Sequence, residues 1–185
     1  GITPLKFAQK MADILGDHRF DSFLAERAES ILLNFDRCYF QGGYYSSKGI
    51  VDDRANAMAV LAGLCKEENY PQIHTILLSV FNATVYMENY ILTALCKMDY
   101  RKDAYHRMMS RYYNLAKNQN STLWEDFNIL GTKNHAWSGA PATIAFRYFM
   151  GIETDDGYQT FRLNYDKSLF KKMNCCFPAK NGIVT

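Results

Sequence analysis

The sequence predicts a mainly α-helical protein: a partial toroid of antiparallel helix hairpins, followed by a short β segment. Apolar residues recur at helical spacing over most of residues 1–150, the links between these stretches are short, and the pattern changes after Gly151. No repeat of fixed length with signature positions is present, which argues against a solenoid. A chain of 185 residues that is 48% hydrophobic can bury a substantial core.

Seven helices are predicted, and several of their starts carry capping signals. Thr3 and Pro4 supply a cap and a first-turn proline, while Asp52 and Asp53 can cap a later helix, as can Thr84. Pro141 marks the start of the last helix, because proline is tolerated only in a first turn, so residues 131–137 form a loop that enters it. In chain order, the helices cover about residues 4–15, 20–35, 58–65, 71–81, 84–98, 105–116 and 138–150.

The chain after Gly151 is expected to form strands. Residues 158–163 and 171–184 are rich in Thr, Phe, Tyr and Val, contain Gly and Pro, and lack a helical period. These features predict the beginning of a β element.

Composition and charge exclude several function classes. A net charge of +2 with dispersed Lys and Arg predicts no nucleic-acid partner, and no apolar run approaches the roughly 18 residues that cross a bilayer. The chain shows no secretory signal. Its five cysteines lack metal-ligand spacing, so no metal or cofactor is predicted, and Cys38, Cys65 and Cys96 are expected to be buried free thiols.

Two segments combine residues that are typical of a carbohydrate pocket. Residues 121–127 contain Trp124 and Glu125, and residues 134–141 contain His135 and Trp137. An aromatic face packs on the C–H face of a sugar, while carboxylate and imidazole groups bind hydroxyls or activate water. Each candidate polar residue, Glu125 and His135, therefore has one of the chain's two tryptophans within two positions in the sequence.

Each of these residues also has a purely structural interpretation. Residues 122–125 read Thr-x-x-Glu, a capping box in which Glu125 only satisfies a helix start. His135 can be a capping or interface residue, and the tryptophans can belong to the core. Such a helical interaction module predicts that Glu125 points back at its own turn and that His135 is buried. A sugar site predicts Glu125, His135 and Trp124 around one open cavity.

The same two segments carry a resemblance to a known family. Residues 122–127 (TLWEDF) followed by residues 131–141 (GTKNHAWSGAP) resemble the catalytic domain of α-L-rhamnosidases of glycoside hydrolase family 78. Three earlier segments follow the order of helices in the (α/α)6 barrel of that family: residues 25–45, 52–64 and 83–95. The change at residues 151–166 is similar to the exit from the barrel into a β-sandwich.

The resemblance implies that the chain is a fragment of an inverting hydrolase that removes terminal α-L-rhamnose. Residues 1–150 would form the C-terminal half of the barrel and contain about seven of its twelve helices. Residues 151–185 would form the start of a truncated β-sandwich. Another toroidal exo-glycosidase remains an alternative, as does the interaction module. The implied partner is a rhamnosyl glycoside, and surfaces uncovered by truncation are expected to favour a dimer. The resemblance places the protein in a bacterium and leaves the cytoplasm, the periplasm and secretion open.

Four site residues follow from the resemblance. Glu125 matches the general base, His135 a ligand of the rhamnose, and Trp124 and Trp137 aromatic walls of the site. An inverting enzyme also needs a general acid, which in this family comes from an earlier D-x-x-x-R-x-E motif that this chain lacks. Residues 52–54 have similar residue types but match a later segment of the family and are expected to cap a helix.

Overall fold

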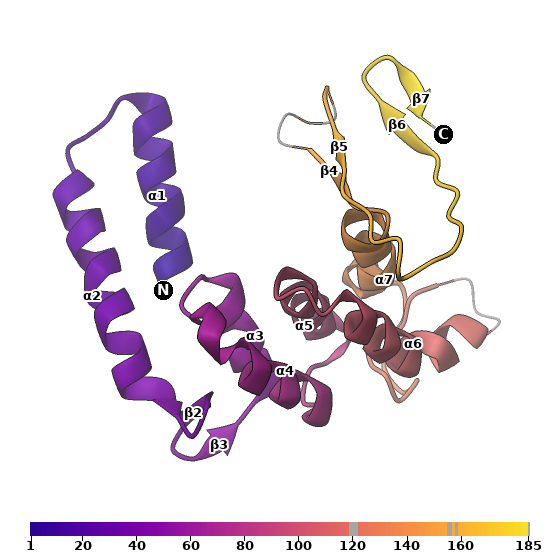
Figure 1. Cartoon of the computed structure of the whole chain (residues 1–185), viewed down its shortest axis with the longest axis horizontal. Helices are drawn as coiled ribbons and strands as arrows, with labels where there is room; N and C mark the ends of the chain where they lie inside the picture. Colours follow the sequence, from indigo (N-terminus) through magenta and orange to yellow (C-terminus); the bar gives the residue numbers. More distant parts are fainter. Residues whose placement is uncertain (119–121, 155–156, 158, 185) are drawn as a thin grey trace. The chain divides into compact units, whose positions relative to one another are not determined.

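The protein is mainly α-helical, as predicted. The computed structural model describes residues 1–118, 122–154, 157 and 159–184, and within them seven α-helices are joined by short strand pairs and turns (Figure 1). The chain forms two compact units, Gly1–Asn82 and Ala83–Thr185. The toroid and the boundary at residue 150 stay predictions.

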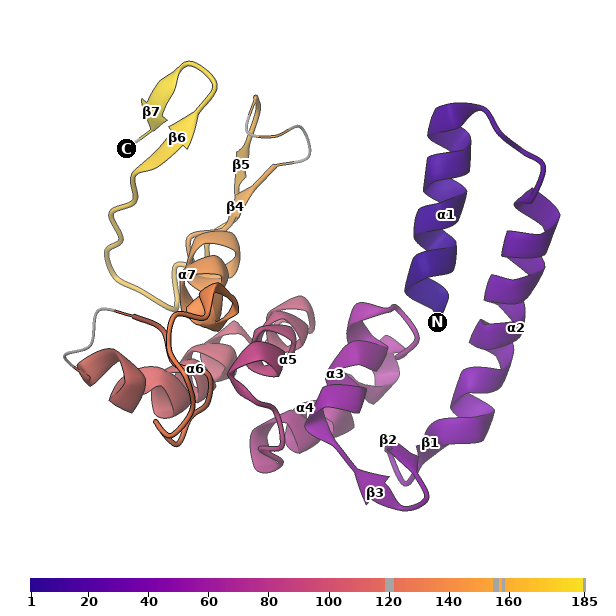
Figure 2. The same cartoon turned by 180° about the vertical axis from the view of Figure 1, so that it is seen from behind.

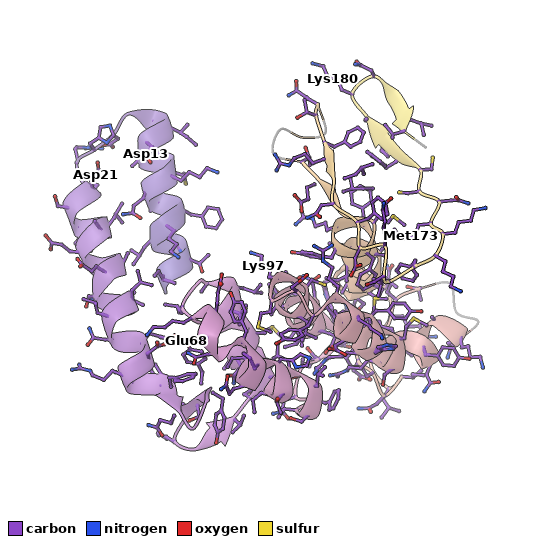
Figure 3. The ribbon with its side chains drawn as sticks, in the orientation of Figure 1. Asp13, Asp21, Glu68, Lys97, Met173 and Lys180 are labelled. Atoms are coloured by element: carbon purple, nitrogen blue, oxygen red, sulfur yellow. The ribbon has the colours of Figure 1, made fainter. Side chains whose placement is uncertain are left out.

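The first unit begins with a helix hairpin. Helices α1 (Ile2–Leu15) and α2 (Asp21–Tyr39) lie side by side in both views (Figures 1 and 2), and the side chains of Asp13 and Asp21 stand near the turn that joins them (Figure 3). Gly16 ends α1 in the left-handed conformation (φ 65°), and its N–H donates to carbonyls of the last turn. Helix α1 begins at Ile2, so the prediction that Thr3 is the cap is wrong.

Apolar side chains of this hairpin are exposed. Phe7 and Met11 of α1 and Phe23 and Leu33 of α2 each keep at least 60% of their surface. Uncovered apolar surface is therefore present in the first unit, while the expected dimerisation stays a prediction.

A three-stranded meander follows α2, and the sequence analysis did not predict it. Strands β1 (Phe40–Gln41), β2 (Tyr44–Ser47) and β3 (Ile50–Val51) pair in the order β1-β2-β3. The β1–β2 turn is Gly42–Gly43, with φ values of 66° and 92°, and two positive φ values are what a tight two-residue hairpin turn requires.

Two short helices complete the first unit. Helix α3 (Asp53–Leu61) is capped by Asp52, whose carboxylate accepts a hydrogen bond from the Arg54 N–H at 2.8 Å, so this predicted cap is confirmed. The helix ends before the predicted residue 65 because the chain turns at Gly63 (φ 69°). Helix α4 (Tyr70–Ser79) follows.

Helix α5 (Val85–Lys97) forms the centre of the second unit. It packs against α6 (Arg101–Lys117) and α7 (Ala140–Ile144), and it is buried along most of its length. Thr84 occupies the N-cap position as predicted, but its side chain makes no capping hydrogen bond. The fully buried apolar residues of α5 are Val85, Ile91, Leu92, Ala94 and Leu95.

The last helical segment is irregular. A 3-10 turn (Ala136–Gly139) leads into α7, and a π-helical turn (Ala145–Phe149) continues it. Pro141 lies in the first turn of α7, as predicted.

Two strand pairs follow α7. Strand β4 (Ile152–Glu153) pairs with β5 (Arg162–Leu163), and β6 (Phe177–Ala179) pairs with β7 (Gly182–Val184). The strands are shorter than predicted, and Tyr158, the expected first residue of one of them, lies outside the described residues. The β4–β5 pair starts at Gly151, where a Cβ atom would meet the Asn164 carbonyl oxygen at 2.0 Å.

Two further subjects of the sequence predictions are membrane-spanning helices and the burial of cysteines. Within the described ranges, no helix has the length and apolar character that a membrane crossing needs. Cys65 and Cys96 are buried free thiols as expected, whereas Cys38 is exposed on α2, so the prediction for Cys38 is wrong.

Candidate functional site

Three of the candidate residues, Trp124, Glu125 and His135, lie on a short hairpin between α6 and α7, and Trp137 lies in the 3-10 turn that follows it. Trp124 pairs with Lys133 in an antiparallel bridge, the Glu125 N–H donates to the Thr132 carbonyl at 3.0 Å, and the Asn134 N–H donates to the Leu123 carbonyl at 2.8 Å. This pairing brings together the two segments that carry the tryptophans. Residues 125 and 135, ten positions apart in sequence, therefore become neighbours.

No helix begins at residues 122–125, so the capping-box interpretation of Glu125 is wrong. Its carboxylate instead reaches across the hairpin, where Oε2 accepts hydrogen bonds from the Thr132 N–H at 2.9 Å and from the Thr132 hydroxyl at 2.7 Å. Glu125 is thus held by a residue that the sequence analysis did not single out.

His135 joins the same cluster through Thr132. Its Nε2 atom lies 2.7 Å from Thr132 Oγ1 and 3.8 Å from Glu125 Oε2. A hydroxyl has one hydrogen, and this one goes to the carboxylate, so Nε2–H must donate to Oγ1. Glu125, Thr132 and His135 form a chain of hydrogen bonds in which His135 is linked to the carboxylate through the Thr132 hydroxyl.

The electrostatics of the cluster keep Glu125 ionised. The two hydrogen bonds from Thr132 lower the pKa of Glu125 below its usual value, and His135 adds a smaller effect in the same direction. The Glu125 side chain remains 46% exposed, so solvent reaches it. An ionised, water-accessible carboxylate can accept a proton from water, whereas a general acid needs a raised pKa.

Gly131 leaves the room that Glu125 occupies. A Cβ atom at position 131 would lie 2.8 Å from Glu125 Cβ and 2.9 Å from Oε2, closer than packed atoms approach. From the sequence alone, Gly131 is predicted only to lie in a loop. The pairing register of the hairpin places Gly131 against Glu125, and the sequence alone does not show that register.

Trp137 lies beside His135. The two ring centroids are 4.5 Å apart, and the indole is 39% exposed. The structure therefore brings Glu125, His135 and Trp137 to one face of the hairpin region.

Trp124 lies elsewhere. Successive side chains of an extended segment point to opposite faces, so Trp124 faces away from Glu125. It is only 7% exposed, the Lys133 ammonium lies 4.6 Å from its ring centroid, and the Ser138 hydroxyl donates to its carbonyl. It lines an apolar cavity of about 350 Å³ with residues of α6 and α7. The expectation that Trp124 shares one cavity with Glu125 and His135 does not match this placement.

A buried ion cluster supports the loop that follows Glu125. Glu88 of α5 is fully buried and binds Arg107 through contacts of 2.6 and 3.0 Å and Arg111 at 3.0 Å. The Arg111 guanidinium lies 4.0 Å from the centroid of the Phe127 ring, and Tyr112 meets the same ring edge-on at 5.1 Å. Phe127 is thereby held on α6, two residues after Glu125.

Over the residues that the structure describes, no three His, Cys, Asp or Glu side chains gather closely enough to hold a metal ion.

Comparison with known proteins shows what the fold is similar to. The crystal structure of a GH78 family rhamnosidase of Bacillus sp. GL1 matches with a TM-score of 0.77 at 18% sequence identity, over 90% of this chain and 20% of that chain. This chain thus spans about one fifth of that structure's length. No protein-family model and no curated protein sequence matches the chain. At this identity the match shows a shared, glycoside hydrolase-like fold.

Proposed function

We propose that this chain is part of an inverting glycoside hydrolase that removes terminal α-L-rhamnose. One observation carries the proposal: Glu125, which matches the family's general base, is held ionised and solvent-accessible beside His135 and Trp137. The fold similarity to a rhamnosidase supports the same reading.

Glu125 is assigned the role of general base. In an inverting hydrolysis, a carboxylate takes a proton from water as the water attacks the anomeric carbon, and a carboxylic acid about 6.5–9.5 Å away protonates the leaving oxygen. The neighbouring carboxylate, Asp126, accepts a hydrogen bond from the Asn128 N–H at 2.8 Å and so stabilises the loop. The general acid is proposed to come from a part of the enzyme outside this chain.

His135 and Trp137 are assigned to the sugar. Because His135 Nε2 is engaged by Thr132, its Nδ1 atom is the ring nitrogen left to hydrogen-bond with a sugar hydroxyl. The half-exposed indole of Trp137 offers an apolar face to the C–H groups of a sugar ring. Trp124, on the other face, is proposed to stabilise the hairpin and not to contact the sugar.

The alternative of a non-catalytic helical module stays open. Its capping-box interpretation of Glu125 does not hold, because no helix starts there. Another toroidal exo-glycosidase, with a different sugar, remains as an outcome of the test below.

The proposal is tested by hydrolysis of 4-nitrophenyl α-L-rhamnoside by the full-length protein that contains this chain. We expect turnover with inversion at the anomeric carbon, followed by proton NMR, and a loss of about 10²–10⁴-fold in kcat for Glu125→Gln. Glu153→Gln is a matched control, since the Glu153 side chain is 47% exposed and Glu125 is 46% exposed. Turnover only of other aryl glycosides would identify a different sugar, and wild-type activity of Glu125→Gln would contradict the assignment of the base.

A further inference from the structure

A cavity lined by basic side chains lies at the C-terminal end of α5, away from the candidate site. Tyr86, in the first turn of α5, packs against Trp137, whereas Lys97, the last residue of the helix (Figure 3), lines the cavity. A helix of 13 residues is roughly 18 Å long, so the two places are separate. We call this space the Lys97 cavity.

The Lys97 cavity is large enough for a small molecule. Its volume is about 600 Å³, and its lining residues all belong to the second unit. This volume lies within the roughly 300–1,000 Å³ that is typical of small-molecule sites.

Positive charge is in excess around the Lys97 cavity. Among the described residues, four cationic side chains line it and one carboxylate, that of Glu153, does so. Glu153 lies 3.9 Å from Arg162, and both side chains are exposed, so this pair contributes little. The four cations are Lys97, Arg101, Arg147 and Arg162.

Two of these cations have no acidic partner. Lys97 and Arg147 are exposed, and neither side chain makes an ion pair or a hydrogen bond with a residue of the described part. Like charges around one space repel one another, and an anion placed between them replaces the repulsion by attraction. The charges of the lining therefore favour an anionic ligand.

Arg101 is held in place by the backbone. Its Nη1 atom donates to the Asn164 carbonyl at 3.0 Å and to the Tyr148 carbonyl at 3.5 Å. Its Nε atom is buried and has no hydrogen-bond partner among the described residues, and the Asp99 carboxylate, which is 91% exposed, lies 3.8 Å from it. The guanidinium is thus positioned before any ligand binds, while its charge is only weakly compensated.

The cationic groups indicate which anion suits the Lys97 cavity. A guanidinium presents a planar fork of N–H donors that matches the oxygens of a phosphate or a carboxylate. A phosphate monoester carries a charge of about −1.5 to −2 at pH 7, and a carboxylate carries only one negative charge. Several cations around one space therefore favour the phosphate, and the volume leaves room for an organic part beside Tyr148 and Ile152.

We propose that the Lys97 cavity binds a small molecule that carries a phosphate monoester, with Arg101, Arg147 and Lys97 around the phosphate oxygens. The inference goes beyond the proposed function and does not depend on it, because none of these residues belongs to the cluster around Glu125.

The test measures binding of inorganic phosphate to the full-length protein that contains this chain, by titration calorimetry at low ionic strength. We expect saturable binding that Arg147→Gln and Lys97→Gln each weaken by roughly fivefold or more, because each removes a positive charge from the cavity. Both side chains are exposed, so neither change disturbs the core, and circular dichroism checks this.

Lys102→Gln is the matched control. Lys102 is exposed and follows Arg101 on α6, but it does not line the Lys97 cavity, so its loss should leave phosphate binding unchanged. A loss of affinity in Lys102→Gln equal to that in Arg147→Gln would show attraction by overall charge and overturn the site. A folded wild-type protein that does not bind phosphate would also overturn it. Acetate tests the choice of anion: weaker binding than phosphate supports a phosphate ligand, and equal binding contradicts it.

Discussion

The hydroxyl of Thr132 donates a hydrogen bond to the carboxylate of Glu125, with Oγ1 and Oε2 2.7 Å apart. The Thr132 backbone N–H donates to the same oxygen at 2.9 Å. One residue thus supplies both of the hydrogen bonds that lower the pKa of Glu125. The protonation of the proposed base depends on a neighbour that itself has no acid or base chemistry.

Replacement of Thr132 should change the pH dependence of the reaction. Thr132→Val removes the hydroxyl donor, so the pKa of Glu125 rises toward its usual value. The base acts only when it is deprotonated, so the fall in kcat/KM on the acidic side should begin at a higher pH. Profiles of kcat/KM against pH for the full-length protein measure this. Thr132→Ser keeps the hydroxyl and should retain the wild-type profile, and an unshifted profile for Thr132→Val would show that the hydrogen bond does not tune the base.

A methyl group at position 131 should displace Glu125. In Gly131→Ala the new Cβ would lie 2.8 Å from Glu125 Cβ, so the carboxylate must move. Because small displacements of a catalytic group are costly, we expect kcat to fall by roughly tenfold or more. The loop is at the surface, so the thermal unfolding temperature should change little. A wild-type kcat for Gly131→Ala would contradict the tight fit of Glu125 against position 131.

The buried ion cluster on α5 should stabilise the second unit. Glu88→Gln leaves the charges of Arg107 and Arg111 without their carboxylate in a buried place, and we expect the free energy of unfolding to fall by about 3–5 kcal/mol. Glu153→Gln breaks only an exposed pair with Arg162 at 3.9 Å and should cost less than about 1 kcal/mol. Urea denaturation followed by circular dichroism compares the two variants. Equal urea midpoints for Glu88→Gln and Glu153→Gln would contradict the stabilising role of the buried ion cluster.

The cysteines should differ in their rates of alkylation. Burial raises the pKa of Cys96 to about 12 and that of Cys65 to about 11, so little of the reactive thiolate is present at pH 8. Cys38 and Cys176 are exposed. Peptide mass spectrometry after timed treatment with iodoacetamide should show Cys38 and Cys176 modified first, and all five modified at similar rates in urea. Early modification of Cys96 in the folded protein would contradict its burial.

The helices could be predicted because their signal is local. The apolar stripes of α5 and α6 and the position of Pro141 depend only on residues within a few turns. The β1–β2 hairpin was not predicted, although the Gly42–Gly43 pair indicates a tight turn, because its strands are too short to show an alternating pattern.

The candidate site was predictable only in part. The chemistry of Glu125, His135 and Trp137 is visible in their residue types, and the hairpin does bring them together. The direction of Trp124 and the role of Thr132 depend on the pairing register of the hairpin, in which a shift by one residue exchanges the faces. A pairing register of this kind has no signature in a single sequence.

Rescue by azide tests the role of Glu125 most directly. Azide is already an anion, so it can attack the anomeric carbon without a base, forming a C–N bond as the C–O bond to 4-nitrophenol breaks. For Glu125→Ala in the full-length protein, with 4-nitrophenyl α-L-rhamnoside, we predict turnover below about 1% of the wild type without azide. Added azide should restore the release of 4-nitrophenol and yield the β-L-rhamnosyl azide, identified by proton NMR. Wild-type turnover of Glu125→Ala without azide, with only free rhamnose as the sugar product, would contradict the assignment of Glu125 as the general base.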